Sequence, residues 1–579
     1  MQKISKSVVL FIILAIIALL TCQWQAKLLT SAAAYHSPLT GEYPAPGESL
    51  PPQSERVVLV ILSGLGDELQ QQLHTPVLEQ LIEAGASATS LSSPPSFRQP
   101  AWTSLISGAA PALNDAPPLF SFNGEVRTVA VDTIFHSAQR ASVGTALLGN
   151  AFWSQIIPPK LVSRSVYAQF DDAPGDEQLM KRVAPLLEDD ALQLFVLQFN
   201  QLAHAAQTSV GRIEDYQTAA DQLDAHLSRL VNLLDLDKTT LIITADYGLI
   251  EGGGRGGHDA PVVGQPFVMT GKRVIPGRYN SIEQIDIAPT IAALLGLSFP
   301  SANQGRPLLE MLQIPDPAPA PISVSLAAQR ITLTQHYLAA LKMPAPTIGN
   351  IAKAEQLLAD KNYAGAAKLA FFLVFQADEA AQQAQENRLS RERRIRFLIL
   401  VAALIILQFY IARQRTKLWV DALLSGAVIV AAYHIIYRLE GLPYSLSAIV
   451  SLEQSWFAVA LRVGASVLLG SLFFLTLLAL RRYTHSAVIL HAAYELFLFA
   501  AIGFILPALY GFWQFGLTVT WYFPDVALFF HYLTALWQTF WLAVMGLLTP
   551  ALIVLLNKGI QKGLSAYQQR QLLKWQTSR

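Results

Sequence analysis

The chain has 579 residues, of which 52% are hydrophobic and only 14% are charged, with 41 basic and 41 acidic side chains. This length allows two or three domains, and the apolar excess favours a membrane protein. The balanced charge and the lack of a basic stripe exclude a nucleic-acid partner. Because Cys22 is the only cysteine, an internal disulfide and a thiolate metal cluster are excluded as well.

The N-terminus carries an apolar run at residues 8–21, preceded by Lys3 and Lys6. This pattern is typical of a signal peptide or of a short anchor whose first residues stay in the cytoplasm. Residues 1–30 are therefore expected to be a signal peptide or signal anchor, and the chain that follows is expected outside the cytoplasm. Lipidation of Cys22 stays open, although the residue before it is not small, as it usually is at a lipidated cysteine.

Residues 31–55 are polar and rich in proline, which predicts a tether rather than a packed element. The branched apolar run at 57–62 then ends at a Ser-Gly turn, as in a buried parallel strand. Further strands are expected at 127–131, 143–148, 192–199, 239–244 and 267–269, and helices at 76–84, 212–234 and 286–295. This alternation predicts an α/β domain over residues 56–313, with helices on both faces of a mostly parallel sheet.

A proline-rich linker and a helical stalk are expected over residues 314–396, with a turn at 360–362. Residues 397–556 are dominated by apolar runs long enough to cross a bilayer. The five expected spans are 397–412, 418–437, 456–480, 487–510 and 526–556. Threading them in order places the basic loop 413–417 and the tail 557–579 on the cytoplasmic side of a multi-pass cell-membrane protein, as the positive-inside rule requires.

Five ionisable residues lie within or near the expected spans, namely Asp421, His434, Arg462, His491 and Glu495. A charge at this depth costs at least ~2.5 kcal/mol on insertion scales, so it usually faces a partner or a wet cavity. Pairing between helices is the favoured interpretation, and a substrate or ion path is the alternative.

Several sequence blocks that follow the predicted strands resemble the alkaline phosphatase superfamily. They are the strand and turn at 57–66, the segment PSFRQPAWTSLISG at 95–108, the segment 241–248, and DIAPT at 286–290. Their order is also that of the family, and the nearest branch is the phosphodiesterase and sulfatase-like enzymes. The resemblance implies an α/β/α sandwich that binds two divalent cations, commonly zinc, beside a threonine or serine nucleophile. Such metals lower the pKa of the nucleophile and clamp the phosphoryl oxygens.

When the family's functional residues are carried over position by position, four positions of this chain differ from the family's pattern. The first metal-binding aspartate falls on Ser63, the nucleophile on Arg98, an aspartate ligand on Asn200, and the histidine of the Asp-His-Gly motif on Tyr247. Arg98 has no nucleophilic oxygen and is permanently cationic. Its forked guanidinium instead suits a phosphate or carboxylate, with Ser63 and Asn200 as further binding residues. Pairing of Arg98 with Asp246 or Asp259 is the structural alternative.

Three positions do match the family's metal ligands, namely His204, Asp246 and His258. They could hold one divalent metal such as zinc with an open fourth position. Asp67 is a possible replacement ligand, and Ser96, Thr103 or Ser104 could replace the nucleophile. The glycine-rich segment 252–257 is not followed by a helix, so it is interpreted as a flexible surface loop.

Because the set of metal ligands and nucleophile is incomplete, the sequence favours a pseudoenzyme over an enzyme. Such a protein would bind an anionic headgroup, a glycan or a protein partner at the bilayer. One alternative is an active metal-dependent phosphodiesterase or phosphoryl-group transferase on lipid-linked or envelope substrates. Another is a transporter or assembly subunit in which the α/β domain caps the helix bundle.

Overall fold

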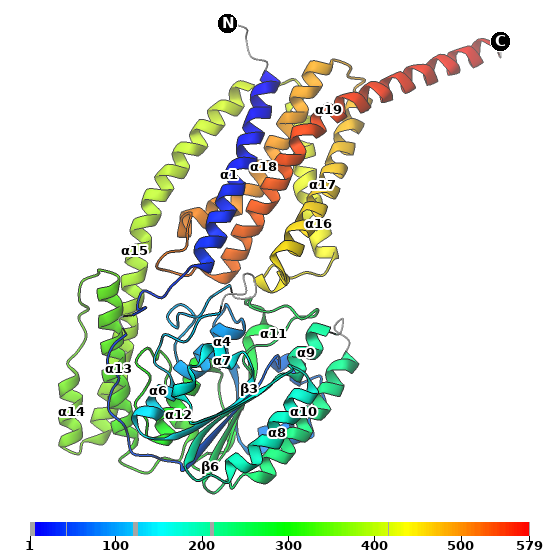
Figure 1. Ribbon diagram of the computed structural model, residues 1–579. Coiled ribbons are helices and arrows are strands. Elements are labelled where there is room, and N and C mark those ends of the chain that lie inside the picture. Colours follow the sequence, from blue (N-terminus) through cyan, green and yellow to red (C-terminus); the bar gives the residue numbers. More distant parts are fainter. Residues whose placement is uncertain (1–5, 42, 120–125, 209–212, 415, 578–579) are drawn as a thin grey trace.

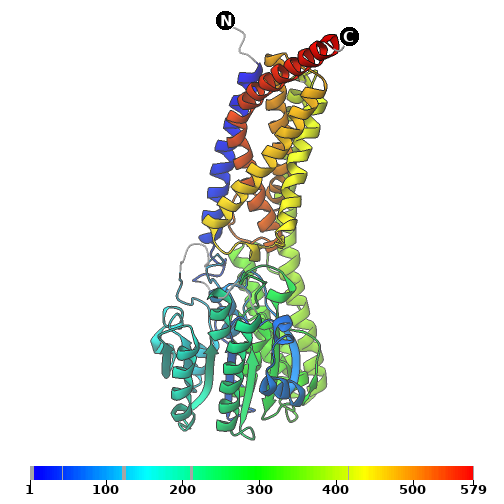
Figure 2. The same cartoon turned by 90° about the vertical axis from the view of Figure 1, so that its right-hand side faces the viewer.

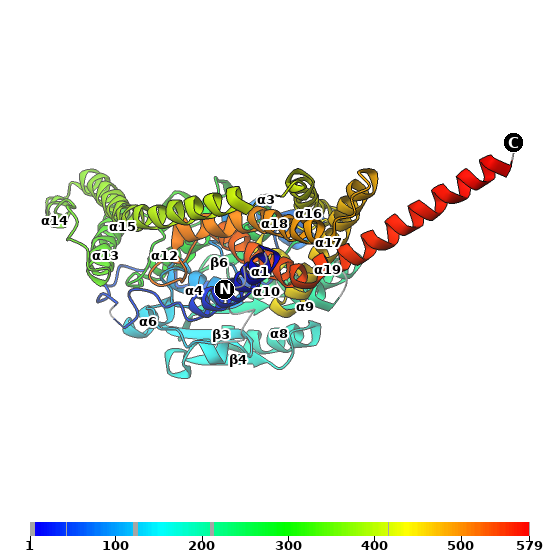
Figure 3. The same cartoon turned by 90° about the horizontal axis from the view of Figure 1, so that it is seen from above.

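A computed structural model describes residues 6–41, 43–119, 126–208, 213–414 and 416–577. The molecule is elongated, with an α/β domain at one end and a helix bundle at the other (Figures 1 and 2). Both chain termini lie at the end of the bundle that is remote from the domain, and the last helix projects sideways beyond the bundle (Figure 3).

The domain is organised around a nine-stranded sheet with the order β4-β3-β5-β1-β6-β7-β2-β8, in which β9 also pairs with β2. The strands from β4 to β6 in this order are parallel, whereas β7 is antiparallel to both β6 and β2. The bounds are β1 Arg56–Leu62, β2 Ala86–Leu91, β3 Gly144–Asn150, β4 Arg164–Ala168, β5 Leu192–Phe199, β6 Thr239–Thr244, β7 Gly264–Gly271, β8 Gly277–Arg278 and β9 Ile282–Glu283. The predicted mostly parallel sheet is confirmed.

Strand β1 is buried on both faces, as its unbroken apolar run predicts. Val57, Leu59 and Ile61 pack with one helical layer, which includes α4, α6 and α12. Val58 and Val60 pack with the opposite layer, which includes α3, α8 and α10. The bounds are α3 Pro76–Ala84, α4 Arg98–Ser107, α6 Ile134–Arg140, α8 Ala173–Leu187, α10 Ile213–Leu233 and α12 Ile287–Leu295. The α/β/α sandwich is therefore confirmed.

The strand predicted at 127–131 is wrong, because this segment pairs with no strand. The backbone carbonyl and N–H of Arg127 bond to the side chain of Gln99 instead. The guanidinium of Arg127 donates to the carbonyls of Tyr35 at 2.6 Å and Ala33 at 2.9 Å. Strands β2 and β4 went unpredicted, since their polar sequences only become strands through partners in the sheet.

The expected tether at 31–55 is instead packed against the domain. Tyr35 and Leu39 are buried, and the N–H of Ser37 donates to Asp115 at 2.8 Å. The backbone of Leu50 bonds to that of Gly296. Proline-rich composition predicts the absence of a helix or strand here, but it does not reveal partners that are distant in sequence.

Three helices form the stalk, α13 (Pro319–Ala340), α14 (Ile351–Ala359) and α15 (Tyr363–Gln414), with the predicted turn between α14 and α15. The long helix α15 rises from the domain and continues beside the bundle (Figure 1). The span expected at 397–412 is the last part of this helix.

Replacement of Arg330 by alanine is expected to lower the free energy of unfolding by about 2–3 kcal/mol, the usual range for charged hydrogen bonds. Arg330 on α13 is buried and donates to Asp378 on α15 at 2.6 and 2.7 Å and to the carbonyl of Gly305 at 2.9 Å. Thermal unfolding of the purified chain measures the effect. Arg306→Ala is the control, since its ion pair with Glu310 is partly exposed and should contribute less than about 1 kcal/mol.

Five helices among the described residues are long and apolar enough to cross a membrane. They are α1 (Lys6–Ala33), α16 (Trp419–Leu439), α17 (Leu452–Leu480), α18 (Ser486–Phe515) and α19 (Val526–Thr577). The N-terminal helix α1 is part of the bundle, because the indole of Trp24 donates to the hydroxyl of Tyr532 at 2.7 Å. The chain is thus a membrane protein by the length and composition of these helices.

Most ionisable side chains of the bundle have partners, in agreement with the favoured interpretation. Arg481 donates to buried Asp421 at 2.8 Å, and Glu495 accepts from the hydroxyl and backbone N–H of Thr416. The first pair joins the start of α16 to the end of α17, where long side chains reach polar surroundings, and the second joins the segment before α16 to α18.

Candidate functional site at the carboxyl edge of the sheet

The ends of three parallel strands meet in one buried hydrogen-bond network. Ser63 follows β1, Asn200 follows β5, and Asp246 follows β6 after one residue. The hydroxyl of Ser63 donates to Asp246 at 2.8 Å and accepts from Gln198 at 2.6 Å, and Gln198 also donates to Asn200 at 2.7 Å. The structure therefore brings Ser63, Asn200 and Asp246 together, where ligands bind in open α/β sheets.

Asp246 is the buried carboxylate at the centre of this network. It accepts from the hydroxyl of Ser63, the indole of Trp102 at 2.6 Å, and the backbone N–H groups of Gly64 at 3.2 Å and Tyr247 at 2.8 Å. Burial raises the pKa of Asp246, and these four donors oppose that rise. Both carboxylate oxygens are thus already engaged by donors of the protein.

Asp176 of helix α8 holds the backbone at Asn200 in place. The backbone N–H groups of Asn200 and Gln201 donate to the Asp176 carboxylate at 3.0–3.1 Å. Burial raises the pKa of Asp176 to about 7, although these two N–H donors favour its charged form.

The free energy of unfolding is expected to fall as the pH rises from about 4 to about 7, because of Asp176. Below the unfolded pKa of about 3.9 both states are protonated, and above about 7 both are ionised. Between these values only the folded state keeps the proton, so unfolding releases it and stability declines with pH. Urea unfolding at several pH values should show a weaker slope in Asp176→Asn. Asp190→Asn, at a fully exposed position, should retain the wild-type slope.

Arg98 is the first residue of α4 and lies at the same edge of the sheet. Its Nη2 is 3.6 Å from Asp171, and its guanidinium lies 5.8 Å from the ring centroids of both Trp102 and Phe152. The alternative pairing of Arg98 with Asp246 or Asp259 is wrong in that the ion pair is made with Asp171. Asp171 is itself fixed by a hydrogen bond from the amide of Asn150.

His204 and His258 do not join Asp246. His204 lies on α9 (Gln201–Thr208) beside a hollow that is also lined by Asp172 and Asp215. His258 is exposed in the loop after β6. No group of three or more His, Cys, Asp or Glu side chains able to hold a metal ion occurs among the described residues. The ligand set expected for one zinc is therefore not assembled, and the residues present do not fit the family's metal pair.

The proposed substitutes are engaged elsewhere or buried. Asp67 accepts from the hydroxyl of Thr89, away from Asp246. Ser104 accepts from the amide of Asn114. Ser96 and Thr103 have buried hydroxyls for which the described part of the chain supplies no hydrogen-bond partner.

The glycine-rich segment 252–257 is not a free surface loop, which corrects the expectation from sequence. Its Gly257 N–H donates to Ser447 of the bundle at 3.0 Å. A Cβ at Gly257 would come within 1.9 Å of the Ser445 hydroxyl, and one at Gly254 within 2.1 Å of the Ser447 carbonyl oxygen. These glycines allow the domain to approach the bundle closely. The high glycine content of this segment indicated a close approach in the sequence, but the sequence does not show which part of the protein the segment contacts.

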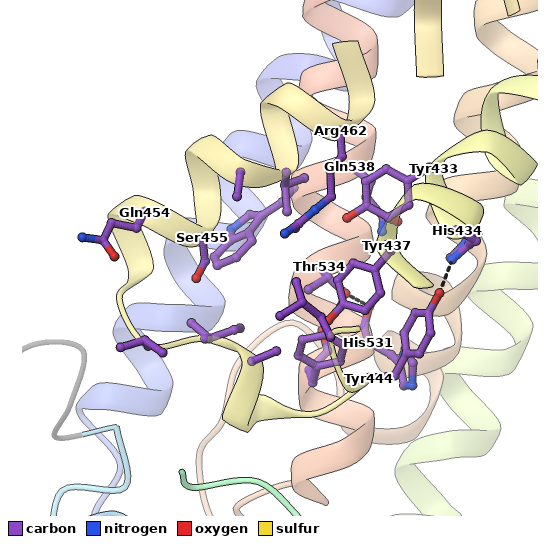
Figure 4. Close-up of a pocket in the computed structure, with 18 of the residues that line it drawn as sticks. Tyr433, His434, Tyr437, Tyr444, Gln454, Ser455, Arg462, His531, Thr534 and Gln538 are labelled. Atoms are coloured by element: carbon purple, nitrogen blue, oxygen red, sulfur yellow. Dashed lines mark hydrogen bonds between the residues drawn. The ribbon is translucent and has the colours of Figure 1, made fainter. Parts of the chain in front are cut away.

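A pocket lined by both apolar and polar side chains also opens in the bundle at the end facing the domain (Figure 4). Its volume is about 250 Å³. Sequence reasoning singled out Arg462 and His434 of its lining but missed Tyr433, Tyr437, Tyr444, His531 and Gln538. The recurrence of polar aromatic residues at helical spacing inside an apolar span was the signal that could have found them.

Comparison with known proteins places these observations in a family. The model of the metalloenzyme superfamily matches residues 153–299. GPI ethanolamine phosphate transferase 3, catalytic subunit, of Mus musculus is 22% identical over 316 residues, covering 50% of this chain and 28% of the relative. GPI ethanolamine phosphate transferase 2, catalytic subunit, of Homo sapiens is 23% identical over 340 residues, covering 52% and 34%. The chain thus spans about a third of the length of these relatives.

Solved structures with related folds were also found. A protein in the alkaline phosphatase superfamily from Vibrio parahaemolyticus is 15% identical, with a TM-score of 0.36, covering 50% of this chain and 79% of that chain. Murine ectonucleotide pyrophosphatase/phosphodiesterase 5 is 12% identical, with a TM-score of 0.34, covering 42% and 96%.

The expectation that leaned away from an enzyme, and the description as a pseudoenzyme, are contradicted by these relatives, which are named transferases. The expectation rested only on the positions of the family's metal ligands and nucleophile. Departures at these positions do not show whether other side chains of the domain support a reaction. The family-model match, the order of the motifs and the mostly parallel sheet agree with one another. Over residues 153–299, the α/β domain therefore matches the metalloenzyme superfamily, and in this chain the domain is joined to membrane helices.

Proposed function

We propose that the protein is a membrane phosphoryl-group transferase or phosphodiesterase that acts on a phosphate ester carried by a lipid. The relatives named as GPI ethanolamine phosphate transferases support this reaction class. The arrangement of the two parts supports the lipid substrate, because the carboxyl edge of the sheet faces the bundle (Figure 1). A substrate anchored in the bilayer would meet this edge without leaving the membrane.

The observation that carries the proposal is a pair of buried donors at this edge. For the Nε of Arg98 and the Nδ2 of Asn200, no hydrogen-bond partner occurs among the described residues. Buried donors of this kind are rare and call for an explanation, such as a ligand that accepts from them. Phosphoryl oxygens suit both donors, and the N-terminus of α4 at Arg98 adds backbone N–H groups that favour an anion.

Arg98 would bind the transferring group and stabilise the negative charge that develops on it, the role that arginine fulfils in many phosphoryl transfers. Metal ions in this superfamily supply Lewis acidity and an activated nucleophile. Since the residues at the sheet edge do not fit a metal pair, no step of the proposal depends on one.

The test uses the full chain in lipid vesicles with phosphatidylethanolamine that is radiolabelled in its headgroup, because the relatives are named for this group. We expect labelled phosphoethanolamine to appear in water or on an added lipid-linked glycan. Vesicles without the protein and heat-treated protein are the controls. Retention of all label in the starting lipid, with correctly folded protein, would contradict the proposal.

The α/β domain is further proposed to lie outside the cytoplasm. Arg481 and Arg482 directly follow α17, and Lys558 and Lys562 lie in the last part of α19, which contacts the end of α17. The last part of α19 lies at the end of the bundle opposite the domain, and the positive-inside rule assigns such basic clusters to the cytoplasm (Figure 1). Protease added to sealed right-side-out vesicles should therefore cut the domain, and complete protection would reverse this orientation.

A further inference from the structure

The pocket of the bundle combines apolar walls with one arginine and several hydroxyl and imidazole groups. Its walls come from α16, α17, α18, α19 and the connection between α16 and α17 (Figure 4). Arg462 is the permanent charge in this lining, and no acidic residue occurs in it among the described residues. Polar side chains at membrane depth are costly and usually mark a site or a wet cavity. Glu440, which pairs with Arg462, lies outside this lining, so Arg462 is the group of the pocket that an anion would contact.

Arg462 is held in place by Glu440 and Tyr437, and its guanidinium also interacts with the hydroxyl of Tyr433. Its Nε and Nη2 both donate to one oxygen of Glu440, at 2.8 and 2.6 Å. Its guanidinium carbon lies 5.1 Å from the ring centroid of Tyr437. Glu440 does not use the Nη1 nitrogen, and the rigid fork of arginine matches the oxygens of a phosphate.

Hydroxyl and imidazole groups surround this cation. Tyr433 and Gln538 lie close to Arg462 in the close-up, while Tyr444 and His531 lie on the side of the pocket nearer the domain (Figure 4). The hydroxyl of Tyr444 and the Nδ1 of His434 are 3.1 Å apart, and the rings of Tyr444 and His531 are stacked with centroids 5.9 Å apart. These groups provide donors for the remaining oxygens of a phosphate ester.

We propose that this pocket binds the phosphate of a lipid headgroup, with Arg462 contacting its oxygens and the acyl chains remaining in the bilayer. A volume of about 250 Å³ holds a headgroup but not the chains. Phe457 and Leu461, on the helix that carries Arg462, are 52% and 76% exposed and give this helix an apolar outer surface.

The pocket adjoins the carboxyl edge of the sheet, which is how this inference deepens the proposed function. Ala448 of its lining follows Ser447, the residue that accepts the N–H of Gly257. His258 in the same loop is close enough to His531 to interact with it electrostatically. A headgroup in the pocket would therefore lie at the boundary with the α/β domain. The inference rests on the proposed function only for the transfer that follows binding.

The test is native mass spectrometry of the full chain in detergent, titrated with phosphatidic acid or with diacylglycerol of the same chains. We expect phosphatidic acid to bind at least tenfold more tightly than diacylglycerol, which lacks the phosphate. Arg462→Gln should weaken phosphatidic acid binding by about tenfold or more, since charged hydrogen bonds are lost. Arg438→Gln, at an exposed arginine near the same end of the bundle, should bind as the wild type does.

A double variant, Glu440→Gln with Arg462→Gln, guards against misfolding because it leaves no charge unpaired. It should keep the wild-type melting temperature and still lose phosphatidic acid. Equal binding of phosphatidic acid by wild type and this double variant would overturn the inference, as would equal binding of diacylglycerol and phosphatidic acid. Displacement of the lipid by equimolar glycerol 3-phosphate would overturn the assignment of the phosphate to a lipid.

The binding measurement needs no turnover, so it separates the two proposals. Selective binding of phosphatidic acid without headgroup transfer would support the pocket and contradict the proposed function. Headgroup transfer that is unchanged in the double variant, together with unchanged lipid binding, would support the function and overturn the pocket.

Discussion

Replacement of Arg98 by glutamine is expected to lower the rate of headgroup transfer by about 10²- to 10³-fold, the usual cost of removing one preorganised donor to a developing negative charge. Arg98 has this weight because it combines a fixed charge with burial. Its side chain is 16% exposed and lies at the N-terminus of α4, where water competes little for a bound phosphoryl group. The assay is release of radiolabelled headgroup by the full chain in vesicles.

Two further variants identify the cause of this loss. Arg98→Lys keeps the charge but not the fork, so an intermediate rate is expected. Arg164→Gln changes an exposed arginine at the far edge of the sheet and should leave the rate unchanged. The ion pair of Arg98 with Asp171 is partly exposed, so the unfolding free energy should change by less than about 1 kcal/mol. Normal transfer by Arg98→Gln would remove Arg98 from the proposed site.

Replacement of Asp246 by alanine is expected to destabilise the domain by about 3–5 kcal/mol, the range found when one member of a buried charged network is removed. The variant leaves four buried donors without their acceptor, those of Ser63, Trp102, Gly64 and Tyr247. Each donor that loses its acceptor stays desolvated, because water does not reach a site with no exposed surface, and this lowers the free energy of unfolding. Urea unfolding of the full chain, followed by tryptophan fluorescence, measures this change.

Two milder substitutions give reference values for this change in the free energy of unfolding. Ser63→Ala removes one donor and should cost about 1 kcal/mol, while Asp246→Asn retains one acceptor oxygen and should fall between the two alanine variants. An Asp246→Ala protein as stable as Ser63→Ala would show that Asp246 is not the centre of the network.

The close contact between the domain and the bundle has a consequence for both sites. Gly254 and Gly257 allow the loop after β6 to reach Ser445 and Ser447, in the connection between α16 and α17. The domain is also tied to the bundle through the continuous helix α15. These two connections join the domain to the end of the bundle at which the pocket opens.

Local sequence patterns determined the elements of this protein. The branched apolar run at 57–62 and the helix at 76–84 were predicted at or near their observed bounds, because burial on both faces and amphipathic periodicity are written in consecutive residues. The apolar runs after residue 418 identified the membrane helices for the same reason. The ordered motifs at the strand ends then identified the superfamily, which the family model confirms.

Tertiary structure decided which side chains meet. His204, Asp246 and His258 match the positions of metal ligands in sequence, yet they lie apart, because a ligand set depends on how three separate loops fold. Arg98 pairs with Asp171, and the glycine-rich loop packs on the bundle, through contacts between residues that are far apart in the chain. Side-chain identity and periodicity are local properties of a sequence. A binding site is built from contacts between residues that are far apart in the chain, and only the folded chain defines those contacts.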